Sequence, residues 1–289
     1  MNFRLDHVVI AVGSLEQAVE DYRSLGFTVH MGGRHPGRTS HNALVVFEDG
    51  AYLELIAWRQ PGPAERWFNV HAQHGDGLMD YALIPDDVAQ AIAEAKARGL
   101  ALDGPIEGGR RRPDGQELKW RTGRQATFDL PFLCGDITPR EWRVPGGEVR
   151  KHANGALGLA AVAVAVLDLE LSLARYCALL GIEPGDGGAV NRAAPVMLPA
   201  PGVRVASITL GDTALVLMNP SGAGGAEPPA FAAGLGARLA TFGEGPCGLA
   251  VRSPHIHGRP LLDMAKTHQV PMEMGSGMLP TGSGLARAV

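Results

Sequence analysis

The chain has 289 residues, 45% hydrophobic and 19% charged, so it can bury a sizeable core and is not a disordered tail. Its formal net charge of -4 and the lack of a basic stripe argue against nucleic-acid binding. Three widely spaced cysteines and the lack of a signal-peptide pattern predict a cytoplasmic protein without disulfides. The apolar run at 157–169 is shorter than the ~20 residues of a membrane helix, so no membrane partner is expected.

The chain opens with the pattern of a strand followed by a helix. Residues 5–12 are apolar and β-branched, as in a buried strand. Ser14 and Gln17 form a capping box for a helix with apolar residues at helical spacing, which Gly26 ends. An extended segment from 27 and a hairpin of strands at 42–47 and 52–58 follow. The predicted order is β-α-β-β-β.

The same order is predicted three more times along the chain. The second module begins with a strand at 78–83 and a helix capped by Asp87, with further strands around 100–106, 117–121 and 126–135. The third begins at Leu159 and ends in a hairpin of strands at 207–210 and 214–217. The fourth begins at 248–251, continues through a helix near 259–269, and lacks a full final hairpin.

The openings of the first and third modules are two copies of one pattern, 154 positions apart. Such self-similarity predicts one supersecondary unit that is used repeatedly. The second copy has lost polar residues, because Ala161 stands where the first copy has His7, and Val216 aligns with Glu54. We therefore expect two halves of paired modules, at 1–145 and 155–289, with the candidate site in the first half and a degenerate second half.

Four motifs of the first module carry a resemblance to a known family: Leu5-Asp6-His7-Val8-Val9-Ile10, Gly32-Gly33-Arg34-His35-Pro36-Gly37, His41-Asn42-Ala43-Leu44 and Asp49-Gly50-Ala51-Tyr52-Leu53-Glu54-Leu55-Ile56. With them, the chain resembles the vicinal oxygen chelate superfamily, and within it glyoxalase-like proteins of four tandem modules. The resemblance implies an α+β fold, in which tandem βαβββ modules pair into curled mixed β-sheets with helices outside. It also implies a small-molecule ligand in the cleft between modules one and two, and leaves a homodimer open.

The superfamily places metal ligands on the first and last strand of each module. The matching positions in this chain are His7 and Glu54 in module one, and Asp80 with either Cys134 or Asp136 in module two. Histidine and carboxylate ligands would suit a divalent ion (Zn, Mn, Fe, Ni or Mg) that acts as a Lewis acid on an enolisable or oxygenated substrate. Two ligands alone would hold an ion weakly. A site without a cofactor, with Glu54 or His7 as catalytic acid or base, therefore stays open.

Five further residues are candidates for substrate binding: His41, Asn42, Tyr52, Trp58 and Trp120. The first two open a strand near the expected mouth of the cleft, and the aromatic residues could form its walls, although turn contacts and core packing would explain them as well. Superfamily members isomerise, epimerise, oxygenate, conjugate thiols to antibiotics or merely sequester ligands, so the fold does not select a reaction. The sequence leaves open a metal-dependent lyase, isomerase or dioxygenase, a metal-free enzyme, and a non-catalytic small-molecule binding or sequestration protein.

Overall fold

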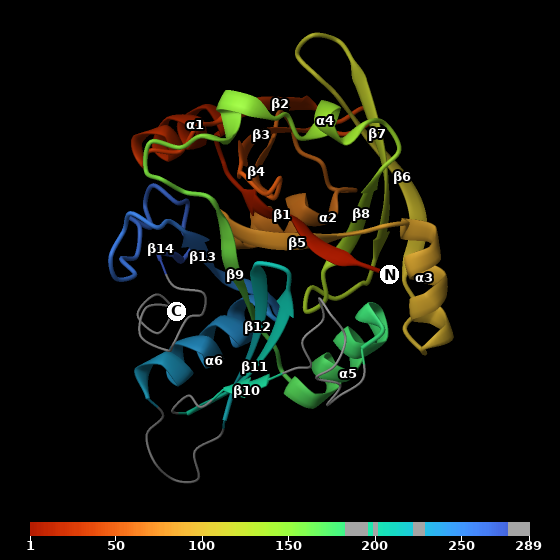
Figure 1. Ribbon diagram of the computed structural model, residues 1–289, viewed down its shortest axis with the longest axis vertical. Coiled ribbons are helices and arrows are strands. Elements are labelled where there is room, and N and C mark those ends of the chain that lie inside the picture. The colour runs from red at the N-terminus through yellow and green to blue at the C-terminus, as the bar shows by residue number, and fades with distance from the viewer. Residues whose placement is uncertain (183–195, 199–201, 222–228, 277–289) are drawn as a thin grey trace.

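A computed structural model describes residues 1–182, 196–198, 202–221 and 229–276 of the chain. Two β-sheets, one a closed barrel and one open, lie one above the other in Figure 1, and most of the helices lie outside them. The predicted α+β class with curled mixed sheets is confirmed.

The first sheet closes into an eight-stranded barrel to which modules one and two contribute four strands each. Its strands, in spatial order, are β1 (Phe3–Ala11), β4 (Tyr52–Trp58), β3 (Ser40–Val46), β2 (His30–Arg34), β6 (Asp103–Arg111), β7 (Glu117–Arg124), β8 (Phe132–Asp136) and β5 (Gly77–Pro85). In each module the first and last strands are parallel neighbours, and the two modules join through the antiparallel pair β1–β5. The pair Arg34–Arg111 joins β2 to β6 on the other side.

The helices of the barrel half begin where the capping residues predict. Ser14 accepts a hydrogen bond from the Gln17 amide at the start of α1 (Leu15–Ser24), and Asp87 does the same for Gln90 at the start of α3 (Val88–Ala97). A helix that the sequence patterns did not predict, α2 (Arg66–His74), connects the two modules. The short helices α4 (Arg140–Arg143) and η1 (Gly147–Arg150) follow β8.

The open second sheet repeats the arrangement of the first module. Its strands, in spatial order, are β10 (Val196–Leu198), β11 (Val203–Leu210), β12 (Thr213–Pro220), β9 (Gly158–Ala165), β13 (Gly245–Arg252) and β14 (Met272–Gly275). Helix α5 (Leu169–Leu180) follows β9, with Asp168 as its N-cap, and helix α6 (Ala230–Phe242) precedes β13.

The helix predicted near 259–269 is absent from the structure. The segment around Leu261 runs beside β14 instead: Leu262 N donates to Met272 O, and Met274 N donates to Pro260 O. Pairing with the edge strand satisfies backbone groups that a helix would otherwise satisfy. The fourth module therefore has a last strand, β14, with the segment around Leu261 paired to it.

The two sheets share one hydrophobic core. Val8 and Ile10 of β1 and Val162 and Val164 of β9 belong to this core, together with the buried faces of α1, α3 and α5. By strand alternation, the neighbouring residues Val9 and Ala11 face the barrel interior. None of the helices in the described ranges has the length and apolar character that a membrane span requires.

Candidate functional site

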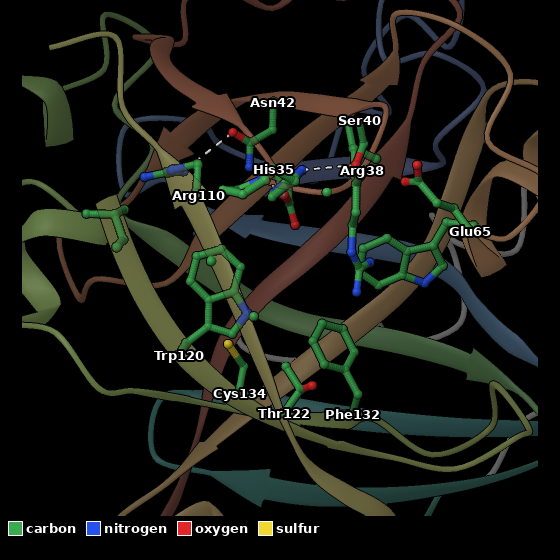
Figure 2. Close-up of a pocket in the computed structure, with 18 of the residues that line it drawn as sticks. His35, Arg38, Ser40, Asn42, Glu65, Arg110, Trp120, Thr122, Phe132 and Cys134 are labelled. Atoms are coloured by element: carbon green, nitrogen blue, oxygen red, sulfur yellow. Dashed lines mark hydrogen bonds and ion pairs between the residues drawn. The ribbon is translucent and has the colours of Figure 1, made fainter. Parts of the chain in front are cut away.

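The barrel encloses a cavity of about 570 Å³ that both modules line. Figure 2 shows His35 and Asn42 on one side of it, and Trp120, Thr122, Phe132 and Cys134 on the opposite side. The other predicted residues in its wall are His7, Tyr52, Glu54, Trp58 and Asp80. The structure therefore brings together both modules' candidate residues, and what each can do depends on its partners.

His7 is held by the residue that precedes it in the sequence. An irregularity in the β1–β5 pairing between Leu5 and His7 allows Asp6 and His7 to interact although they are adjacent in a strand. Asp6 Oδ2 lies 2.7 Å from His7 Nδ1, and both side chains are buried. Because an ionised carboxylate can only accept, Nδ1 carries a proton, and Nε2 faces the Glu54 carboxylate. The imidazole also stacks on Tyr52, with 4.6 Å between ring centroids.

Asp6 stays ionised because two arginines after β8 surround it. Arg143 Nη1 lies 2.7 Å from Oδ2, and Arg140 Nη1 lies 2.7 Å from Oδ1. Burial alone would favour the neutral acid, but Arg143, His7 and Arg140 together hold the pKa of Asp6 well below its usual value. Arg143 also donates to Asp136 and to the Tyr52 hydroxyl. The role of Asp6 was not predicted, since strict alternation would place its side chain on the other face.

Glu54 lies between two imidazoles. Its Oε2 is 3.5 Å from His7 Nε2, and its Oε1 is 3.7 Å from His35 Nε2. Asn42 Nδ2 donates to Oε1 at 2.5 Å and fixes the carboxylate. Gly32 on the adjacent strand leaves room for this contact, because a Cβ there would collide with Asn42 Oδ1 and with Arg110.

His35 was quoted in a motif but was not predicted as a site residue. It lies on the turn between β2 and β3, where its Nδ1 is 3.0 Å from Ser40 Oγ. The Ser40 hydroxyl donates to Glu65, so its oxygen accepts from His35 Nδ1–H, and the ring directs the Nε2 lone pair toward Glu54. Burial lowers the pKa of His35 to about 4, which keeps the ring neutral. A histidine directly before Pro36, in a glycine-rich turn near the His41-Asn42 motif, was the available signal.

Asp80 is the module-two counterpart of His7, because each stands seven residues before the N-cap of its module's helix. Its Oδ2 accepts from Trp67 Nε1 at 3.0 Å, and its Oδ1 accepts from the Tyr81 amide at 3.0 Å. Arg66 Nη2 lies 3.8 Å away. Burial raises the pKa of Asp80 to about 6 despite these partners. The carboxyl group therefore titrates near neutral pH inside the cavity.

The raised pKa of Asp80 makes a prediction about stability. Between the ordinary value of 3.8 and about 6, the folded protein holds a proton that the unfolded chain releases, so stability falls as the pH rises through this window. Asp80→Asn lacks this titration. The free energy of unfolding of the wild type relative to Asp80→Asn should fall by up to about 3 kcal/mol between pH 4 and pH 7. Urea denaturation of both proteins across this range measures it; a constant difference would contradict the assigned pKa.

Strand register identifies the residue that corresponds to Glu54 in each of the four modules. Glu54 pairs with Val9 in β1, and the equivalent partner strands pair Phe132 with Ala82, Val216 with Ala163 and Glu273 with Ala250. Phe132, rather than Cys134 or Asp136, therefore holds the module-two position. Cys134 lines the cavity, and burial raises the pKa of its thiol. Asp136 binds Arg143. The strand expected at 126–135 begins instead at Phe132, and this explains why the sequence pointed to Cys134 or Asp136.

The register also changes the expectation for the second half. Ala161 and Val216 do replace His7 and Glu54, as the repeat predicts. The fourth module, however, carries Glu273 at the last-strand position, although no matched ligand was expected there. Its side chain is buried, neither carboxylate oxygen has a hydrogen-bond partner, and burial raises its pKa. The rest of this sheet face is filled, because Leu235 and Leu239 of α6 pack into the same apolar cluster as Ala161 and Val216.

Among the predicted substrate-binding residues, Asn42, Tyr52, Trp58 and Trp120 line the cavity, whereas His41 does not. His41 is the neighbour of Asn42 in β3, and successive strand residues point to opposite faces. It lies half-buried on the outer face, where Glu16 of α1 is one of the charges acting on it. The proposal of His41 as a cavity residue is therefore not supported by its position.

The ligand positions of the fold family offer an incomplete metal site in this chain. They supply His7, Glu54, Asp80 and Phe132, and the last of these cannot bind a metal. In the described ranges, no three His, Cys, Asp or Glu side chains already group tightly enough to hold an ion. The pair His7–Glu54 nevertheless suits one, since an imidazole nitrogen and a carboxylate oxygen, both common metal donors, face each other at 3.5 Å. Asp6 supplies the carboxylate partner that metal-bound histidines usually have.

Comparisons with known proteins agree with this architecture. A family model described as a glyoxalase-like domain matches residues 5–180, more than half of the chain. A hypothetical protein from Staphylococcus aureus shares 10% identity at a TM-score of 0.65, over 94% of this chain and 98% of its own. A mutant of 4-hydroxymandelate synthase from Streptomyces coelicolor shares 16% identity at a TM-score of 0.55, over 88% of this chain and 71% of its own. At such identities the likeness concerns the fold. No curated protein sequence matches significantly.

Proposed function

Because the chain belongs to the glyoxalase-like family of the vicinal oxygen chelate superfamily, we propose that its barrel cavity is an enzyme active site for a small oxygen-rich molecule bound at a divalent metal ion. The contact between His7 Nε2 and Glu54 Oε2 at 3.5 Å carries this proposal. The two atoms face each other inside a buried cavity, and an imidazole nitrogen and a carboxylate oxygen are compatible at this separation when a cation or a proton lies between them. The reaction would be that of a lyase, isomerase or dioxygenase.

His7 and Glu54 would hold the ion, and Asp6 and Asn42 would orient these two ligands. The bound ion would supply a Lewis acid that polarises an oxygen atom of the substrate. The chain itself supplies the binding surface and the groups that move protons.

Arginines at the cavity favour an anionic substrate. Arg38 is exposed on the turn after His35, and Figure 2 shows it extending into the space above Phe132. Arg110 is buried beside Asn42, and its Nε has no hydrogen-bond partner. Burial disfavours its charge and therefore lowers the pKa of its guanidinium. Burial excludes water around Arg110, which strengthens its attraction for a carboxylate or enolate.

Asp80 is suited to transfer a proton to or from the substrate. Its pKa of about 6 lies near the pH at which the protein would work, and such a match favours general acid–base catalysis. Trp67 and the Tyr81 amide hold its carboxylate in place at the cavity wall. We therefore assign Asp80 the role of general base rather than of metal ligand, and expect the rate to fall as the pH drops below about 6, where the carboxylate becomes protonated.

Hydrogen exchange of candidate substrates tests this function. Metal-loaded protein in D₂O would be incubated with 2-oxo acids, 2-hydroxy acids and catechols, and followed by proton NMR and oxygen uptake. The wild type should exchange or convert at least one of these compounds, while Glu54→Gln should not. Glu117→Gln, an exposed carboxylate of the same cavity wall, serves as the matched control and should behave as the wild type.

Non-catalytic binding is the second candidate. It is favoured by Phe132, which fills the fourth ligand position, and by the aromatic walls formed with Trp58 and Trp120. A protein of this kind would bind apolar ligands with unchanged affinity after Glu54→Gln and convert none of the compounds tested. That combination of results would replace the enzymatic proposal.

A further inference from the structure

We propose that His35 is the third protein ligand of the metal site, so that the ion is held by module one alone. The inference rests on the proposed function and names the missing donor of that same site. It departs from the arrangement in which two modules share the ion, because neither module-two position provides a free donor here.

Both imidazoles lie close to the Glu54 carboxylate. His35 Nε2 lies 3.7 Å from Glu54 Oε1, and His7 Nε2 lies 3.5 Å from Glu54 Oε2. Two donors that bind one ion at ~2.0–2.2 Å with tetrahedral geometry are separated by about 3.4 Å. Each imidazole therefore already stands at nearly the separation from Glu54 that a shared ion requires. The three groups do not yet converge on one point, and the broad terminal torsion of the glutamate allows an ion to draw them together.

The hydrogen bonds of His35 fix which nitrogen faces the carboxylate. Ser40 donates its hydroxyl proton to Glu65, which also accepts from the Thr39 amide at 2.7 Å and from Trp58 Nε1 at 3.1 Å. Ser40 Oγ must therefore accept from His35 Nδ1–H, and His35 Nε2 is an acceptor. His7 has the same arrangement through Asp6. Both imidazoles thus have their Nδ1 anchored by a neighbouring side chain, the pattern of metal-bound histidines.

The position of His35 in the fold makes it a rigid donor. Its backbone amide donates to Ser40 O at 3.1 Å and closes the turn between β2 and β3. Its side chain is 8% exposed and meets Trp120 edge-on, with 6.2 Å between ring centroids. A buried acceptor nitrogen that faces a carboxylate oxygen with no donor between them is costly. A divalent ion relieves this cost for both imidazoles at once.

The module-two positions are already engaged. Both Asp80 oxygens accept hydrogen bonds, from Trp67 Nε1 and from the Tyr81 amide, and Arg66 lies beside them. Phe132 occupies the last-strand position and carries no donor. Two histidines and one carboxylate would leave open positions for a substrate, as in sites that bind small oxygenated ligands at non-haem iron or manganese.

Metal titration of matched variants tests the inference without any substrate. Chelator-treated wild type, His35→Ala, His7→Ala, Asp80→Asn and His41→Ala would be titrated with Zn²⁺ and Co²⁺ by calorimetry, and bound metal counted after dialysis. His41→Ala is the control, since His41 is the sequence neighbour of Asn42 but lies on the opposite face of β3. We expect one ion per chain in the wild type, His41→Ala and Asp80→Asn. His35→Ala and His7→Ala should each weaken binding by at least about 100-fold.

Two measurements keep the test valid if His35→Ala folds poorly. Ser40→Ala removes only the anchor of His35 and should weaken binding by about 10–100-fold. In Cu²⁺-loaded protein, electron paramagnetic resonance should count two imidazole nitrogens in the wild type. If the wild type binds one ion but His35→Ala binds it equally well, or a single imidazole is counted, the role of His35 is wrong while the metal site stands. If the wild type binds no ion, both the inference and the metal-dependent function are wrong.

Discussion

Asp6→Ala should destabilise the folded protein by about 3–5 kcal/mol, because it leaves the buried guanidinium of Arg143 without a carboxylate partner on this side. The aspartate is fully buried and also binds Arg140 and His7, so no water replaces it readily. Urea denaturation measures the loss, with circular dichroism to verify the fold.

The matched control for Asp6→Ala is Asp114→Ala. Asp114 forms an ion pair with Arg112 on an exposed turn, and such surface pairs contribute about 0–1 kcal/mol. If Asp6→Ala lowers the free energy of unfolding as little as the control does, the network around Arg143 does not stabilise the site. A large change would link the opening motif to stability as well as to the orientation of His7.

Divalent metal should stabilise the wild type against unfolding, and Glu54→Gln should abolish the effect. A ligand that binds only the folded state adds about 2.7 kcal/mol at a free concentration 100 times its Kd. Replacing the carboxylate by an amide removes the negative charge between the two imidazoles and presents a donor or a neutral oxygen instead. Thermal and urea unfolding with and without Zn²⁺ measure the difference.

Glu117→Gln should retain the full metal-dependent stabilisation, since Glu117 is exposed and pairs with Arg111. A similar stabilisation of Glu54→Gln would place the ion elsewhere in the molecule. The buried and unpartnered Glu273 of the second half would then be the first residue to substitute.

Repetition in the sequence was sufficient to predict the scaffold. The capped helices α1 and α3 begin at the expected residues, and the strands that carry His7 and Glu54 lie side by side. Helices α2 and α6 were missed because the first has no buried residue and the second follows a glycine-rich tract that favours a linker. Both connect the last strand of one module to the first strand of the next.

The site could be predicted only as far as strand alternation holds. Alternation places Glu54 and His7 in the cavity, but it hides Asp6, whose contact with His7 depends on an irregularity of the β1–β5 register. Alternation makes no prediction for His35, because this residue lies in a turn, where side chains do not alternate between two faces. The last-strand positions of modules two and four were hidden too, since β8 begins later than the predicted strand at 126–135 and β14 was not predicted.

Crystals of the zinc-loaded protein would test the central claim most directly, through the anomalous signal of the bound ion. The account predicts one fully occupied ion in the barrel cavity, ~2.0–2.2 Å from His7 Nε2, from a Glu54 oxygen and from His35 Nε2. A cavity that remains free of metal under saturating zinc, or an ion bound only outside the barrel, would contradict it.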